Sequence, residues 1–151
     1  MSNRPRRLVL RGFSPCHHAE MDGFGIVVGA GSLRTASAAS SFPHRWTGEG
    51  VTVDAAFTGA HLLHLAVAGC VLNDVYREAA TIGLALRGVR VGADGAFDEN
   101  TWHSTGIEYW IEIDSDAERA QLDALLRRVD AVAEIPRTIR AGARVERVAA
   151  P

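Results

Sequence analysis

The sequence contains no lysine, because all 16 of its basic residues are arginine. This absence excludes Schiff-base chemistry, which needs a lysine amine. Arginine and lysine are not physically interchangeable and no single function demands their global exchange, so we interpret the bias as a codon-usage signature. With 18 acidic residues the net charge is -2, without the basic excess that is typical of nucleic-acid binding. We therefore expect no nucleic-acid partner.

Cysteine is also scarce. Cys16 and Cys70 are too few for a disulfide framework, and their spacing matches no zinc motif. The glycine-rich stretch 23–31 misses the GxGxxG fingerprint of dinucleotide sites and precedes no expected helix. The sequence therefore predicts neither a metal site nor a cofactor.

Long hydrophobic runs are missing as well. Residues 1–11 carry charge but no apolar core of a signal peptide, and the longest apolar run, 62–72, is too short to cross a membrane. We expect a cytoplasmic protein with no membrane partner.

The composition is that of an ordinary globular protein. A chain of 151 residues with 47% hydrophobic residues fits a single domain over 1–151. Hydrophobic periodicity predicts an α+β fold that begins as a β-meander and contains a long buried helix and a second helix. The expected strands are 7–10, 25–28, 51–53, 86–91, 106–113 and 138–148, and the expected helices are 60–82 and 116–133, the latter ended by Pro136.

The helix predicted at 60–82 has apolar residues on nearly all sides. Thr58 is its expected N-cap and Gly83 its expected C-cap. A helix that is apolar all round belongs in a core or in an interface rather than on a surface. This pattern predicts a homodimer built around the helix.

Cys70 is the principal candidate for chemistry. Small neighbours such as Ala66 and Gly69 would let another element approach its sulfur. On the same helical stripe Arg77 would favour the thiolate, whereas Asp74 would oppose it. The alternative interpretation is a small, buried and unreactive side chain, which is the commonest state of a free cysteine.

Two histidine groups offer weaker candidates. Cys16 is followed by His17 and His18, but adjacent side chains on a strand point to opposite faces, so a surface turn is the simpler interpretation. His61 and His64 share one helical face without a carboxylate or a third histidine on it. We expect them to be partly buried histidines at a helix start.

Two local sequences together resemble those of a known family. Residues 58–70 read TGAHLLHLAVAGC, residues 73–75 follow as NDV, and residues 133–140 read AEIPRTIR. In this order, after a β-rich start, they resemble the OsmC/Ohr family, the osmotically induced and organic hydroperoxide resistance proteins. The resemblance extends over 51–148.

The resemblance implies a small, intertwined α+β homodimer with the two cysteine-bearing helices at its centre. In active members the helix cysteine attacks an organic hydroperoxide as a thiolate and becomes a sulfenic acid. A second cysteine, immediately before a proline, then forms a disulfide with it, and a dithiol reductant reopens that bond.

Carried over to this chain, the resemblance assigns Cys70 to the peroxidatic position. Ile135 stands where the second cysteine is expected. Because isoleucine cannot condense with a sulfenic acid, the usual disulfide cycle cannot run.

The family also uses a glutamate near the helix start and an arginine from the N-terminal half to activate the thiolate. At the helix start this chain has Ala60 and His61. Arg34 and Arg45 are the candidates for the arginine, and His61 is a further possible helper.

Three functions remain open at this point. The first is a one-cysteine thiol peroxidase, in which an external thiol rescues oxidised Cys70. The second is a member without peroxidase activity that binds a small apolar molecule at the dimer interface. The third is a structural dimer without a ligand. The sequence favours an OsmC-like protein associated with oxidative-stress defence.

Overall fold

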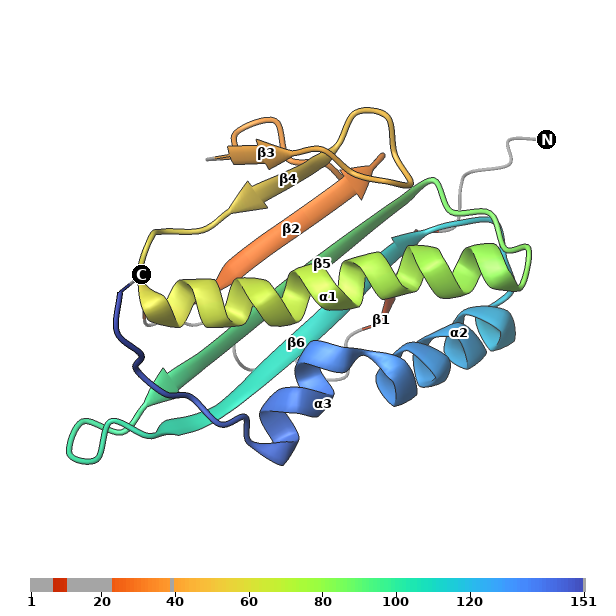
Figure 1. The fold of residues 1–151 in the computed structure, drawn as a ribbon. Helices are drawn as coiled ribbons and strands as arrows, with labels where there is room; N and C mark the ends of the chain where they lie inside the picture. The colour runs from red at the N-terminus through yellow and green to blue at the C-terminus, as the bar shows by residue number, and fades with distance from the viewer. Residues whose placement is uncertain (1–6, 11–22, 39, 151) are drawn as a thin grey trace.

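The computed structural model describes residues 7–10, 23–38 and 40–150. Within them, three helices cover one face of a six-stranded antiparallel sheet, which confirms the α+β class (Figure 1). Cys16, His17 and His18 lie outside the described residues. The elements in chain order are β1 Arg7–Leu10, β2 Ile26–Gly31, β3 Ser40–Phe42, β4 Val51–Asp54, α1 Gly59–Thr81, β5 Gly88–Phe97, β6 Ser104–Asp114, α2 Arg119–Val132 and α3 Glu134–Ala141.

The strands pair in the order β1-β6-β5-β2-β4-β3. The long β5–β6 hairpin forms the middle of the sheet, and its register runs from Gly88 opposite Asp114 to Phe97 opposite Ser104. The expected β-rich start is present, but its strands do not form a consecutive meander. The reason is that β1 pairs with β6, whereas β2 pairs with both β5 and β4.

The long helix α1 has the N-cap that its sequence predicts, whereas its C-cap is Ile82, one residue before the expected Gly83. The Thr58 hydroxyl accepts a hydrogen bond from the His61 amide at 3.3 Å, which satisfies one free N–H of the first turn. Gly83, with φ of 68°, takes the left-handed conformation that commonly follows a helix. No helix among the described residues is long and apolar enough to cross a membrane.

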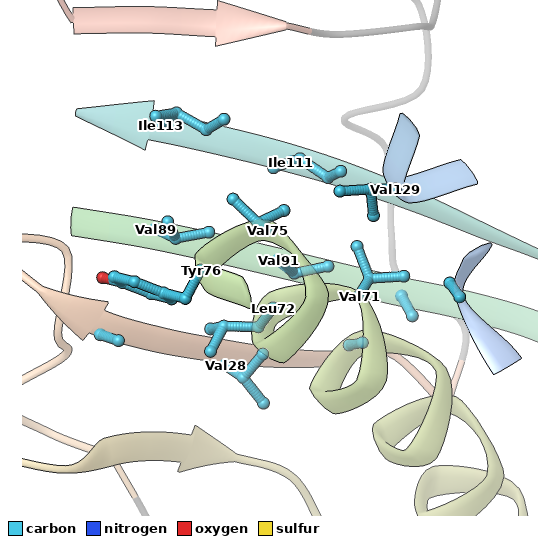
Figure 2. Packing of buried hydrophobic residues seen from close by; sticks show 14 of the residues in the cluster. Val28, Val71, Leu72, Val75, Tyr76, Val89, Val91, Ile111, Ile113 and Val129 are labelled. Atoms are coloured by element: carbon cyan, nitrogen blue, oxygen red, sulfur yellow. The ribbon is translucent and has the colours of Figure 1, made fainter. Parts of the chain in front are cut away.

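The core lies between α1 and the sheet (Figure 2). Side chains one and two turns apart on α1, such as Val71 and Val75, pack on alternate residues of β5 and β6. Each fully buried valine or leucine contributes about 1.5–3 kcal/mol through its removal from water. The largest fully buried apolar side chains of the core are those of Ile26, Val28, Val71, Leu72, Val75, Val89, Val91, Ile113, Leu122, Leu125 and Val129.

The other side of α1 is not covered within the chain. Leu62, Ala66 and Asn73 are exposed there, and Gly69 and Cys70 are half-buried. This uncovered face explains why the helix has apolar residues beyond those that its own core needs.

The C-terminal part departs from the predicted strand 138–148, and that prediction is wrong. Residues Glu134–Ala141 form the helix α3, and no regular structure follows over 142–150. Pro136 does not stop α2, which has already ended at Val132; it lies in the first turn of α3. Proline is tolerated in that turn because its missing N–H would have no partner within the helix.

Gly31 joins β2 to the turn that follows it, and its backbone requires glycine. Its φ is 59°, and a Cβ at this position would collide with the Arg87 carbonyl oxygen. We expect Gly31→Ala to lower the free energy of unfolding by about 2–4 kcal/mol, from the strained φ and the collision together. Gly48 has a free surrounding, so Gly48→Ala is the matched control. Equal denaturant midpoints for the two variants would contradict this interpretation.

Candidate functional site

The half-buried thiol of Cys70 lies where α1 meets the start of α3. Its Sγ is 3.7 Å from Oε2 of Glu134 and 3.9 Å from Oδ2 of Asp74. Cys70 is the free cysteine among the described residues. The structure therefore places a thiol in direct contact with two carboxylates from different helices.

Helical spacing brings together the members of this site that come from α1. Asp74 and Arg77 follow Cys70 by four and seven residues on α1, so the three side chains share one face. Glu134 is the first residue of α3, and the short connection between α2 and α3 positions it. Ala133 in that connection is fully buried, and its amide donates to the Val129 carbonyl at 2.9 Å. This anchored turn fixes Glu134 above α1.

Burial raises the pKa of the Cys70 thiol above its ordinary value. A hydrogen bond from the Ile135 backbone amide works in the opposite direction, because it stabilises the thiolate. The negative charges of Asp74 and Glu134 raise the pKa further. The expectation that Asp74 opposes the thiolate is thus confirmed.

The two carboxylates hold a proton unequally. Burial raises the pKa of Asp74 to about 6, and the neighbouring Glu134 adds to the rise while Arg77 opposes it. The pKa of Glu134 is lowered, first by its own backbone N–H and also by Arg77 and a hydrogen bond from Asp74. When the pair carries one proton, Asp74 holds it and donates to Glu134.

Arg77 binds the carboxylates rather than the sulfur. Its Nη1 is 3.0 Å from Oδ1 of Asp74 and 3.8 Å from Oε1 of Glu134, and its Nε is 3.1 Å from Oε1 of Glu78. Glu78, which is nearly buried, also forms an ion pair with Arg128 of α2. This network fixes the carboxylates beside Cys70. The positive charge of Arg77, which was expected from the sequence to favour the thiolate, is instead paired with the carboxylates.

The helpers expected from the sequence lie elsewhere in the chain. The Arg45 guanidinium stacks over Trp46, 5.8 Å from the ring centroid, and Arg34 is exposed in the turn after β2. His61 shares a 2.7 Å hydrogen bond with Thr58 at the start of α1. Their roles at the thiol stay predictions, since the groups that act on the sulfur within the described chain come from other positions.

His64 is a fully buried structural histidine. Its Nδ1 lies 2.8 Å from the Phe24 carbonyl oxygen. Among the described residues, the one group of side chains with the spacing of metal ligands is Cys70, Asp74 and Glu134, whose donor atoms lie within 4.8 Å of one another. A cation there would have to compete with Arg77, which already pairs with both carboxylates.

Sequence reasoning placed Ile135 beside Cys70 but missed Glu134. The effect of the Ile135 amide on the pKa of the thiol agrees with a place for position 135 close to the sulfur. The signal for Glu134 was its place immediately before Ile135, combined with an acidic side chain at the first turn of a helix.

Comparison with known families agrees with this architecture. A family model described as OsmC-like protein matches residues 52–147. The match includes all of α1 with Cys70 and all of α3. A comparison with curated proteins returned no match.

Proposed function

This chain belongs to the OsmC-like protein family, and from that membership we propose that it is a one-cysteine thiol peroxidase acting on organic hydroperoxides. The family supports a general OsmC-type, stress-associated function. The observation that carries the finer proposal is a half-buried Cys70 thiol with hydrogen-bonding groups on two sides, Glu134 and the Ile135 amide. The Glu134 carboxylate can accept a proton, and the Ile135 amide stabilises a sulfur anion.

The proposed reaction has two stages. The sulfur of Cys70 attacks the terminal oxygen of the hydroperoxide, the O–O bond breaks, and a sulfenic acid and an alcohol result. Because Ile135 offers no second sulfur, an external low-molecular-weight monothiol then condenses with the sulfenic acid and releases water. A second molecule of that thiol displaces the mixed disulfide and restores Cys70.

A homodimer is part of this proposal. The uncovered face of α1, with Leu62, Ala66 and Gly69, is apolar and built from small residues that allow a second helix to approach closely. A second copy packed on this face would exclude water from the surroundings of Cys70.

The same face favours a second candidate function. Leu62 is 39% exposed beside Ala66, so an apolar molecule held between two copies would find hydrophobic contacts there. This alternative needs no reaction at Cys70, and chemical trapping at the thiol separates the two functions.

The test uses the Cys16→Ser variant, in which Cys70 is the remaining cysteine. We expect tert-butyl hydroperoxide to convert Cys70 to a sulfenic acid that dimedone traps, with about one alcohol formed per thiol. A monothiol should restore the free thiol and permit turnover, and the additional substitution Cys70→Ser should abolish both. Mass spectrometry that finds Cys70 unmodified under these conditions would overturn the peroxidase proposal in favour of the binding function.

A further inference from the structure

Two carboxylates beside a thiol are an unexpected feature of a site that needs a sulfur anion. Negative charge next to Cys70 makes the thiolate harder to form. Nevertheless the chain holds both groups firmly, since Arg77 pairs with Asp74 and Glu134 and is itself held by Glu78. An arrangement this well supported suggests a role other than charge.

The pair extends from the interior to the surface. The Asp74 side chain is 4% exposed, whereas that of Glu134 is 64% exposed. Each places an oxygen within 4.0 Å of the Cys70 sulfur. A hydroperoxide reaching Cys70 from solution would therefore meet Glu134 on its way to the sulfur.

We propose that Asp74 and Glu134 form a proton relay, which takes the proton from the Cys70 thiol and returns one to the leaving alkoxide. This inference rests on the proposed peroxidase function and assigns its acid–base groups. As the S–O bond forms, the S–H proton passes to the Glu134 carboxylate. The O–O bond breaks with its electron pair on the alkoxide, which receives a proton from the pair and leaves as alcohol. Sulfur is oxidised by two electrons and the hydroperoxide is reduced by two.

The groups facing this relay come from three helices. Within the described chain, α1 contributes Arg77 and Glu78, and α3 contributes the Ile135 amide. Arg128 of α2 reaches the cluster through its ion pair with Glu78. Arg77 is thus a positioning residue, while Asp74 and Glu134 touch the reacting sulfur.

The relay predicts different pH profiles for two reactions of the same thiol. Alkylation by iodoacetamide needs the thiolate and delivers no proton, so its rate should rise about tenfold per pH unit from pH 6 to 8.5. Oxidation by tert-butyl hydroperoxide needs both carboxylates ionised, because a protonated Asp74 donates to Glu134 and thereby weakens that carboxylate as a proton acceptor. Because the pKa of Asp74 is raised to about 6, the oxidation rate should fall below that pH and be nearly constant above it.

Glu134→Gln separates the relay from a purely electrostatic role. Loss of the charge should lower the pKa of Cys70, so alkylation at pH 7 should become several-fold faster. Oxidation by the hydroperoxide should become at least about tenfold slower, because the relay is broken, and its pH profile should then follow that of alkylation. Asp74→Asn should act in the same directions.

The exposed Glu99 of the β5–β6 turn provides the control, and Glu99→Gln should change neither rate. If Glu134→Gln accelerates alkylation and oxidation together, the carboxylate acts through charge alone and the relay is overturned while the peroxidase proposal stands. If the parent chain shows no oxidation of Cys70 at any pH, the peroxidase proposal fails and the relay fails with it.

Discussion

Replacing Ile135 by cysteine should make Cys70 one half of an intramolecular disulfide when the protein is treated with hydroperoxide. The Ile135 backbone amide lowers the pKa of the Cys70 thiol, and Glu134, the residue before it, lies 3.7 Å from the sulfur, so position 135 is close to Cys70. A disulfide needs Cα atoms within about 7 Å, and a side chain at position 135 fulfils the remaining requirement if its Cβ points to the sulfur. The loss of the half-buried isoleucine should cost about 1–3 kcal/mol of stability.

The readout is a non-reducing peptide map of Ile135→Cys in the Cys16→Ser background. Ile139→Cys is the matched control, because position 139 lies one helical turn further along α3, about 6 Å away. A linked species in the first variant and not in the second would agree with the structure. A variant that folds, consumes hydroperoxide and never forms the bond would show that position 135 is not equivalent to the family's second cysteine.

Turnover with a dithiol carries additional information. If Ile135→Cys gains dithiol-dependent peroxidase activity, this one side chain separates the chain from the two-cysteine cycle. A disulfide without turnover would instead indicate that turnover also requires the family's activating glutamate and arginine. Arg34 and Arg45 are the candidates for that arginine in this chain.

A charged residue in the middle of the uncovered face of α1 should change the oligomeric state. Ala66 is exposed in the single chain and lies one turn from Leu62. We expect the unsubstituted protein to be a dimer at micromolar concentration. Ala66→Arg should yield a monomer, because dimerisation would bury two unpaired guanidinium groups against apolar surface.

Light scattering measures this directly. Ala96 is exposed near the end of strand β5, so Ala96→Arg should leave the dimer intact and serves as the control. A monomeric parent protein would contradict the proposed interface, and so would a dimer that tolerates Ala66→Arg unchanged.

Much of the fold could be predicted from the sequence because local signals and tertiary packing agree there. The Thr58 cap, the long apolar stretch and Gly83 define α1 to within one residue at each end. Apolar residues alternate with polar or aromatic ones over 107–113, which predicts β6, and Ile111 and Ile113 are buried on the helix-covered face.

The C-terminal helix could not be predicted in this way. Alternating apolar residues over 139–145 imitate a strand, and an eight-residue helix is too short for its own period to outweigh that pattern. Pro136 led to the wrong prediction that a helix ends there, because proline is compatible with the first turn of a helix as well as with the residues after its end.

Part of the candidate site could be predicted from the sequence and part could not. Cys70, Asp74 and Arg77 share a helical stripe, so their proximity follows from spacing alone. Glu134 comes from another element, 64 residues away along the chain, and meets Cys70 only through the packing of α3 on α1. The spacing of residues along the helix also does not reveal that the guanidinium group of Arg77 pairs with carboxylates.

The most direct test of the central claim compares Cys70 with a free thiol. The measurement is the second-order rate constant for tert-butyl hydroperoxide at pH 7, for the Cys16→Ser protein and for N-acetylcysteine. The pKa of Cys70 is raised, so an unassisted thiol in its place would react more slowly than the free one. Proton transfer by neighbouring groups contributes about 100-fold or more, which outweighs the loss from the raised pKa, and we therefore predict that Cys70 reacts at least about tenfold faster than the free thiol. A rate constant equal to or below that of N-acetylcysteine would contradict the assignment of Cys70 as a peroxidase thiol.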